Sequence, residues 1–99
     1  MKHFLILITY TAPIEKIDLI LQEHRNFLQT GYDKNILLLS GPNTSRTTGI
    51  VLARNNSLED IKKFFASDPY LINNLASYEF IEFNPVKHQG FLKEWINAE

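Results

Sequence analysis

The chain of 99 residues contains no cysteine, so disulfide bonds, thiolate nucleophiles and thiolate metal sites are excluded. This absence is typical of proteins from a reducing compartment. Neither sign of charge is in excess, because ten lysine and arginine residues stand against eleven aspartate and glutamate residues. No run of basic residues occurs either, so the sequence predicts no nucleic-acid partner.

The sequence also lacks a hydrophobic segment long enough to cross a membrane. The apolar run at 4–8 reaches polar residues at once, and no cleavage site of small residues follows it. We therefore expect a buried strand here, in a soluble cytoplasmic protein without a membrane partner. A hydrophobic content of 44% is that of a globular chain, and the length suits one core. A single domain over residues 1–99 is expected.

Hydrophobic periodicity predicts alternating strands and helices. The predicted strands are residues 3–10, 36–39, 49–54 and 78–83, and the predicted helices are residues 14–30, a second helix after the N-cap Ser57, and a short amphipathic helix around 91–96. Pro13 is predicted at the first position of the first helix, and Gly31 is predicted to end it in a left-handed conformation. In the second helix, Leu58, Ile61 and Phe65 are predicted to face the core.

This order of elements is the split βαβ, or ferredoxin-like, pattern. It predicts an α+β fold with a four-stranded antiparallel sheet and a short additional C-terminal helix. Two helices can cover only one face of such a sheet, yet the first three strands are apolar on both faces. A large open apolar face is unusual on a monomer, so we expect a homodimer formed through the face without helices.

His24 lies on the apolar stripe of the first helix, one turn from Ile20 and Leu21 and one turn from Phe27 and Leu28. Its imidazole is therefore directed toward the packed side, where a polar group needs a partner. One interpretation is a general acid or base, because imidazole titrates near neutral pH. The other is a core histidine that is hydrogen-bonded to a backbone carbonyl.

Asp68 precedes Pro69 and is predicted to be the N-cap of a new short helical turn. This structural role would explain the aspartate without any catalytic role. The two roles are compatible, since one carboxylate oxygen can cap the turn while the carboxylate also faces His24.

In this arrangement the chain resembles the YCII-related (YciI-like) family of small dimeric ferredoxin-like proteins. The matching residues, in order along the chain, are His24-Arg25-Asn26-Phe27-Leu28 with Gly31, Ser40-Gly41-Pro42, Arg46 with Gly49-Ile50, Asp68-Pro69-Tyr70, and the strand from Tyr78 to Pro85. The family pattern has a glycine where this chain has Asn74. Asparagine tolerates the left-handed backbone better than most residues, so we expect the turn to be kept.

The resemblance implies a dimeric α+β barrel whose pocket contains His24 and Asp68 as a catalytic His–Asp site. A few related proteins are dehydrochlorinases of aromatic catabolism, which implies a cofactor-free lyase or isomerase for a small anionic or aromatic molecule. Two alternatives stay open. One is a non-catalytic ligand-binding or stress-related accessory dimer with the same pocket, and the other is a purely structural dimer with an inert histidine.

Further candidates surround this implied pocket. Arg25 and Arg46 could hold an anionic substrate, although a solvated surface arginine is the ordinary role of each. The candidate substrate-binding residues are Arg25, Ser40, Gly41, Pro42, Arg46 and Tyr70. Ser40-Gly41-Pro42 is predicted to be the turn that leaves the second strand, with Gly41 in a backbone conformation that is hard for other residues. Gly41 would also let a ligand approach the backbone. No nucleophile elbow surrounds Ser40.

No metal or other cofactor is expected. His3, His24 and His88 are far apart in the sequence, and no two of them have the spacing of ligands on one element. Phe91 and Trp95 are predicted to dock the last helix.

Overall fold

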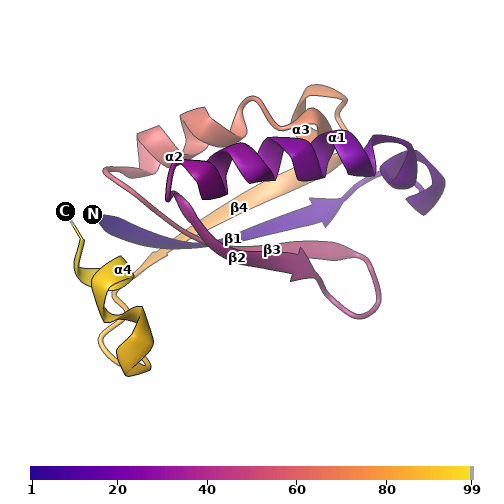
Figure 1. Cartoon of the computed structure of the whole chain (residues 1–99). Coiled ribbons are helices and arrows are strands. Elements are labelled where there is room, and N and C mark those ends of the chain that lie inside the picture. Colours follow the sequence, from indigo (N-terminus) through magenta and orange to yellow (C-terminus); the bar gives the residue numbers. More distant parts are fainter. Residues whose placement is uncertain (99) are drawn as a thin grey trace.

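A computed structural model describes residues 1–98. The elements are, in order, β1 (Lys2–Tyr10), α1 (Ile14–Asp33), β2 (Leu37–Pro42), β3 (Thr48–Asn55), α2 (Leu58–Phe65), α3 (Pro69–Ile72), β4 (Ala76–Phe83), a 3-10 turn (Gly90–Leu92) and α4 (Lys93–Asn97). The four strands form one antiparallel sheet in the order β2-β3-β1-β4. Helices α1, α2 and α3 lie over one face of this sheet, and α4 lies at one end (Figure 1). The ferredoxin-like α+β fold is therefore confirmed, together with the short C-terminal helix.

The core lies between the helices and the face of the sheet that they cover. Alternate residues of β1, namely Phe4, Ile6 and Ile8, are almost fully buried, as the period of two in a strand requires. The helices contribute fully buried residues from the opposite side, including Ile17 and Ile61. Side chains of the central strand β1 and of the helices thus share one core.

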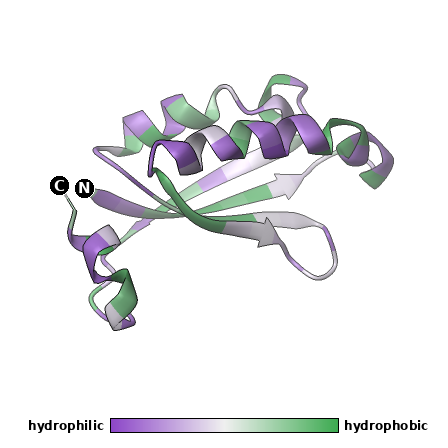
Figure 2. Ribbon diagram, in the orientation of Figure 1, coloured by the Kyte–Doolittle hydropathy of each residue, from purple (hydrophilic) through white to green (hydrophobic). Residues whose placement is uncertain are grey.

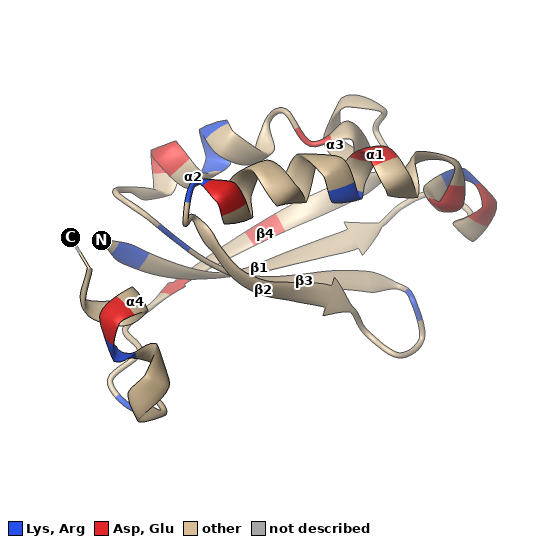
Figure 3. Cartoon of the chain, in the orientation of Figure 1, with Lys and Arg blue, Asp and Glu red and all other residues tan. Residues whose placement is uncertain are grey.

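The opposite face of the sheet has no helical layer and remains apolar. Its exposed large side chains are Leu39 (53% exposed), Ile50 (36%), Ile81 (38%) and Phe83 (40%). Parts of β1 and β2 are coloured hydrophobic in Figure 2, whereas Figure 3 shows no charged residue on β2 and acidic residues on β4. The first three strands carry apolar residues on both faces, as predicted, and β4 adds Glu79 to the open face opposite Leu7.

Helix α1 runs through Gly31 and ends at Asp33, so the prediction that Gly31 ends the helix is wrong. No glycine in residues 1–98 has a positive φ. The left-handed residue is instead Asn35 (φ 59°), and the Ile36 N–H donates to the Gly31 carbonyl at 2.8 Å. This is a Schellman ending. Pro13 precedes the first helical residue as the N-cap rather than occupying the first position.

Gly31 is required for close packing instead. A Cβ atom at this position would lie 2.7 Å from Leu37 Cγ and 2.7 Å from Phe64 Cζ. Any larger side chain would therefore push α1 away from the start of β2 and from α2. The expectation of an unusual backbone at Gly41 is also wrong, and nothing lies within 4 Å of its Cβ position.

The caps of α2 and α3 are as predicted. Ser57 Oγ accepts a hydrogen bond from the Asp60 N–H at 3.1 Å, and Asp68 caps α3. Asn74 has a φ of 56°, so the left-handed turn after α3 is kept. Leu58 is 37% exposed, so its predicted place in the core is wrong, because the first residue of α2 lies at the edge of the layer.

Two further predictions need correction. Ser40-Gly41-Pro42 belongs to β2 rather than to a turn, because its residues pair with the start of β3. Trp95 docks the C-terminal helix as predicted, with its ring 5.6 Å from that of His3 and 4.9 Å from Arg54 Cζ. Phe91, however, is 84% exposed and docks nothing.

Across residues 1–98, none of the helices has both the length and the apolar character that crossing a membrane would require.

Candidate functional site

His24 and Asp68 meet in a direct hydrogen bond. His24 projects from the middle of α1, and Asp68 lies in the turn between α2 and α3. These three helices lie on the same face of the sheet, so the two side chains can meet. The Nδ1 atom of His24 is 2.7 Å from Oδ1 of Asp68. The histidine side chain is 11% exposed and the aspartate side chain is fully buried. The expected convergence of these two residues is therefore present in the structure.

The Asp68 carboxylate has a hydrogen-bond donor for each oxygen. Oδ1 accepts from His24 and also from the backbone N–H of Tyr70 at 3.1 Å, which is the N-cap bond of α3. Oδ2 accepts from the hydroxyl of Tyr78 at 2.5 Å. Because a carboxylate can only accept, His24 must donate through Nδ1. In the neutral ring, Nε2 then holds the free lone pair.

Tyr70 forms the wall behind the imidazole. Its ring stacks on that of His24 with centroids 3.9 Å apart and planes 10° from parallel. The side chain is fully buried, and burial raises the pKa of Tyr70 to about 12. Tyr70 does not line the pocket, unlike the other predicted substrate-binding residues. Its position restricts the orientation of the His24 ring.

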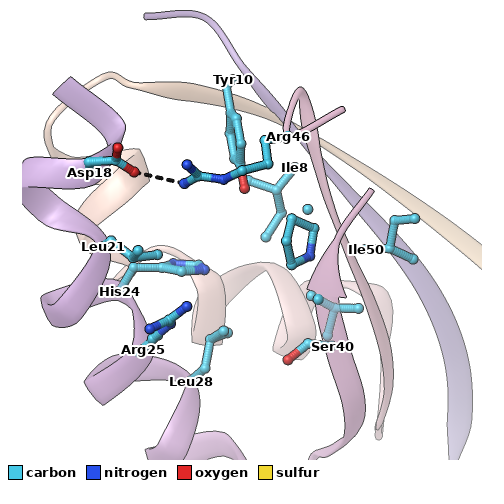
Figure 4. A pocket seen from close by; sticks show the side chains of 14 residues that line it. Ile8, Tyr10, Asp18, Leu21, His24, Arg25, Leu28, Ser40, Arg46 and Ile50 are labelled. Atoms are coloured by element: carbon cyan, nitrogen blue, oxygen red, sulfur yellow. Dashed lines mark hydrogen bonds and ion pairs between the residues drawn. The ribbon is translucent and has the colours of Figure 1, made fainter. Parts of the chain in front are cut away.

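A pocket of about 580 Å³ opens beside the histidine, between α1 and the ends of β2 and β3. Its lining residues are Ile8, Tyr10, Asp18, Leu21, His24, Arg25, Leu28, Ser40, Gly41, Pro42, Arg46, Gly49, Ile50 and Val51. The imidazole of His24 points into this space (Figure 4). Five of the six predicted substrate-binding residues, Arg25, Ser40, Gly41, Pro42 and Arg46, therefore lie around one cavity with His24.

Arg46 and Asp18 form an ion pair at the rim of this pocket (Figure 4). Arg46 Nη2 donates to Asp18 Oδ1 at 2.7 Å, and both side chains are about half exposed. The hydrogen bond and the charge of Asp18 raise the pKa of Arg46. Arg46 also has a φ of 55°, which is rare for a residue with a long side chain. The loop between β2 and β3 thus holds this guanidinium in a strained backbone position at the rim.

Ser40 lines the pocket wall and shares a hydrogen bond with the Tyr32 hydroxyl at 2.6 Å. This contact connects β2 to the last turns of α1. Since the partner is a tyrosine rather than a base, the contact orients the Ser40 hydroxyl without activating it as a nucleophile.

Tyr78 and Asp18 are the members of the site that sequence reasoning missed. Tyr78 alternates with Phe80 on the face of β4 that the helices cover, and that period of two could have placed it near the end of α2. Asp18, Leu21, Arg25 and Leu28 follow the three-and-four spacing of one helix stripe, which could have placed Asp18 beside Arg25.

Within residues 1–98, no three or more histidine, cysteine, aspartate or glutamate side chains are grouped so that they could hold a metal ion.

The family model of the YCII-related domain matches residues 1–84. The chain belongs to the YCII-related family. No curated protein matches its sequence at a significant level.

A solved structure with a similar fold is the 5-chloro-2-hydroxyhydroquinone dehydrochlorinase of Burkholderia phenoliruptrix, in complex with 2,5-dihydroxybenzoquinone. The TM-score is 0.68 at 17% sequence identity, over 90% of this YCII-related chain and 97% of the dehydrochlorinase. At this identity the likeness concerns the fold alone.

Proposed function

We propose that this YCII-related protein binds a small anionic ring compound and acts on it as a cofactor-free lyase or isomerase, with His24 moving the proton. One observation carries the proposal. A buried carboxylate holds Nδ1 of His24, while the ring points into a cavity that also contains Arg25 and Arg46. An imidazole held in one tautomer beside cationic groups is suited to removing a proton from an anionic substrate.

The proton step requires no oxidant or metal. In dehydrochlorination the reacting form of the ring is a keto tautomer, in which chlorine is bound to an sp3 carbon next to a C=C bond that carries a hydroxyl. Nε2 of His24 takes the proton of this hydroxyl, the O–H electron pair forms a C=O bond, and the C=C bond shifts to the carbon that bore chlorine. Chloride leaves with the electrons of its bond, so the net loss is HCl and the product is a quinone. In an isomerisation, Nε2 takes a proton from an sp3 carbon next to a carbonyl group and returns it to a different carbon. Asp68 stabilises the imidazolium that forms in either reaction.

The charge around the pocket supports an anionic substrate. Arg25 has neither an ion-pair partner nor a side-chain hydrogen bond within residues 1–98, and Arg46 is engaged only with Asp18. A guanidinium binds a carboxylate or an acidic enol in a two-pronged geometry. The bound 2,5-dihydroxybenzoquinone of the dehydrochlorinase is an acidic ring compound of this kind, which supports the substrate class proposed here.

The test combines binding with turnover. Calorimetry with 2,5-dihydroxybenzoquinone measures binding, and release of chloride from chlorinated hydroxyhydroquinones measures turnover. His24→Gln should retain most of the binding and lose about 10²-fold to 10⁴-fold in kcat. His88→Gln is the matched control, because His88 is exposed and lies outside this pocket. Equal turnover by wild type and His24→Gln would contradict the proposal. Binding without any turnover would support the non-catalytic ligand-binding alternative.

We also propose that the protein works as a homodimer, in which the open face of the sheet is covered by the same face of a second copy. The support is the group of exposed apolar side chains on β2, β3 and β4, with no charged residue on β2. Contiguous apolar surface of this kind marks association sites on soluble proteins.

A further inference from the structure

Tyr78 contacts the site from β4, on the side of Asp68 that faces away from the pocket. We propose that Tyr78 is a positioning residue for His24. Its hydroxyl fixes the Asp68 carboxylate and offsets part of its charge, so that less of that charge acts on the His24 imidazole. This inference rests on the proposed function only in treating His24 as the base.

The hydrogen bonds of Asp68 give Tyr78 this role. Oδ1 already has two donors, Nδ1 of His24 and the N–H of Tyr70, whereas Oδ2 has only the Tyr78 hydroxyl. Asp68 is fully buried, so loss of the Tyr78 donor leaves Oδ2 without another hydrogen-bond donor from the described residues. A buried carboxylate oxygen without a donor is costly, and gaining positive charge nearby relieves that cost.

The nearest source of positive charge is the imidazole itself. Without the phenol, the full negative charge of Asp68 would act on His24. The imidazole already has a proton at Nδ1, so the pair would take up its next proton, at Nε2, at a higher pH than in the wild type. A charge-assisted hydrogen bond of this kind corresponds to about one pH unit. Tyr78 cannot give up its own proton near neutral pH, because burial and the negative charge of Asp68 raise its pKa.

The other charged and titratable groups near the pair come from three elements and the β2–β3 loop. They are Asp18 and Arg25 on α1, Tyr10 on β1, Tyr70 on α3 and Arg46 on the loop. All of them stay in place when only the Tyr78 hydroxyl is removed, so their effects on the titration cancel between wild type and variant.

The experiment follows the ¹⁵N resonances of the histidine rings during a pH titration of the full chain. Tyr78→Phe should move the His24 titration upward by about one pH unit. Asp68→Asn should move it in the opposite direction, because the negative charge itself is lost. Tyr32→Phe is the matched control, since it also removes a bonded tyrosine hydroxyl, at Ser40 rather than at Asp68. Its His24 titration should match wild type.

A His24 titration in Tyr78→Phe that matches the Tyr32→Phe control would overturn the inference. If Tyr78→Phe does not fold, 3-fluorotyrosine at position 78 keeps the shape of the side chain and donates a stronger hydrogen bond. The titration should then move to lower pH, and an unchanged curve would equally overturn the inference. The titration needs no substrate, so a failure to find turnover leaves this result standing. Where a substrate is found, the acid limb of kcat/KM should move with the titration.

Discussion

Arg46 donates a 2.7 Å hydrogen bond to Asp18 at the rim of the pocket, from the β2–β3 loop to helix α1. The guanidinium that is best placed to meet an incoming anion is thus already engaged by a carboxylate of the same chain. An anionic ligand must compete with Asp18 for Arg46.

The first prediction follows from this competition. Asp18→Asn should tighten the binding of 2,5-dihydroxybenzoquinone by about twofold to fivefold, the range expected for an exposed ion pair. Calorimetry at low salt measures the change, and added salt should reduce it. Glu15→Gln is the control, because it removes one negative charge from the same helix outside the pocket lining. If both variants tighten binding equally, the effect comes from net charge alone, and the competition between Asp18 and the ligand is refuted.

The second prediction concerns assembly. Analytical ultracentrifugation should find a dimer at micromolar concentration, and Ile81→Lys should convert it to a monomer by placing a charge on the open sheet face. Leu19→Lys is the control, because Leu19 is 79% exposed on α1, away from that face. A wild-type protein that sediments as a monomer would contradict the proposed dimer.

The third prediction separates the two glycines of the first half of the chain. Gly31→Ala should lower the free energy of unfolding by about 1 kcal/mol, because overpacking against Leu37 and Phe64 outweighs the gain in helix propensity. Gly41→Ala has an open Cβ position and should stabilise by up to about 0.5–1 kcal/mol. Urea unfolding of both variants measures the difference, and a stabilised Gly31→Ala would refute the packing argument.

The fourth prediction is a pH dependence at the other end of the sheet. Burial, the N-terminal charge and Arg54 lower the pKa of His3 below its ordinary value of 6.5. As the pH falls through about 6.5, His3 therefore takes up a proton in the unfolded chain before it does so in the folded chain, and the free energy of unfolding decreases. His3→Phe keeps a ring against Trp95 and should flatten this loss between about pH 7 and pH 5.

Chemical unfolding at several pH values measures the slope of that loss. His88→Phe is the matched control, because His88 is exposed and should leave the slope unchanged. An equal acid loss in wild type and His3→Phe would assign the dependence to other groups.

Local rules in the sequence were sufficient for much of the fold. The spacing of apolar residues along α1 places His24 on its packed side, and the residue before Pro69 must leave the helix, which makes Asp68 a cap. Both effects act within a few residues of the chain. For the same reason, Ser57 and the left-handed Asn74 were predictable.

The sequence-based errors have longer-range causes. The left-handed residue after α1 is Asn35, whereas Gly31 packs closely against β2 and α2. A local sequence pattern does not show these contacts. The Ser40-Gly41-Pro42 segment stays in β2 because β3 continues beside it. The period of two along β4 indicates that Tyr78 faces the helices, but its contact with Asp68 depends also on the register of β4 against β1, which a single-strand pattern does not give.

The strand order has a consequence for how the molecule forms. His24 and Asp68 are 44 positions apart, and the Tyr78 hydroxyl that completes the carboxylate arrives on β4, which pairs with the first strand of the chain. Contacts of such separation close after local helices have formed. A nascent chain that lacks β4 can already contain α1, yet its Asp68 has no phenolic donor. The Asp68 carboxylate therefore gains its last hydrogen-bond donor only when β4 pairs with β1, so the hydrogen bonding of the His24–Asp68 pair is completed late in folding.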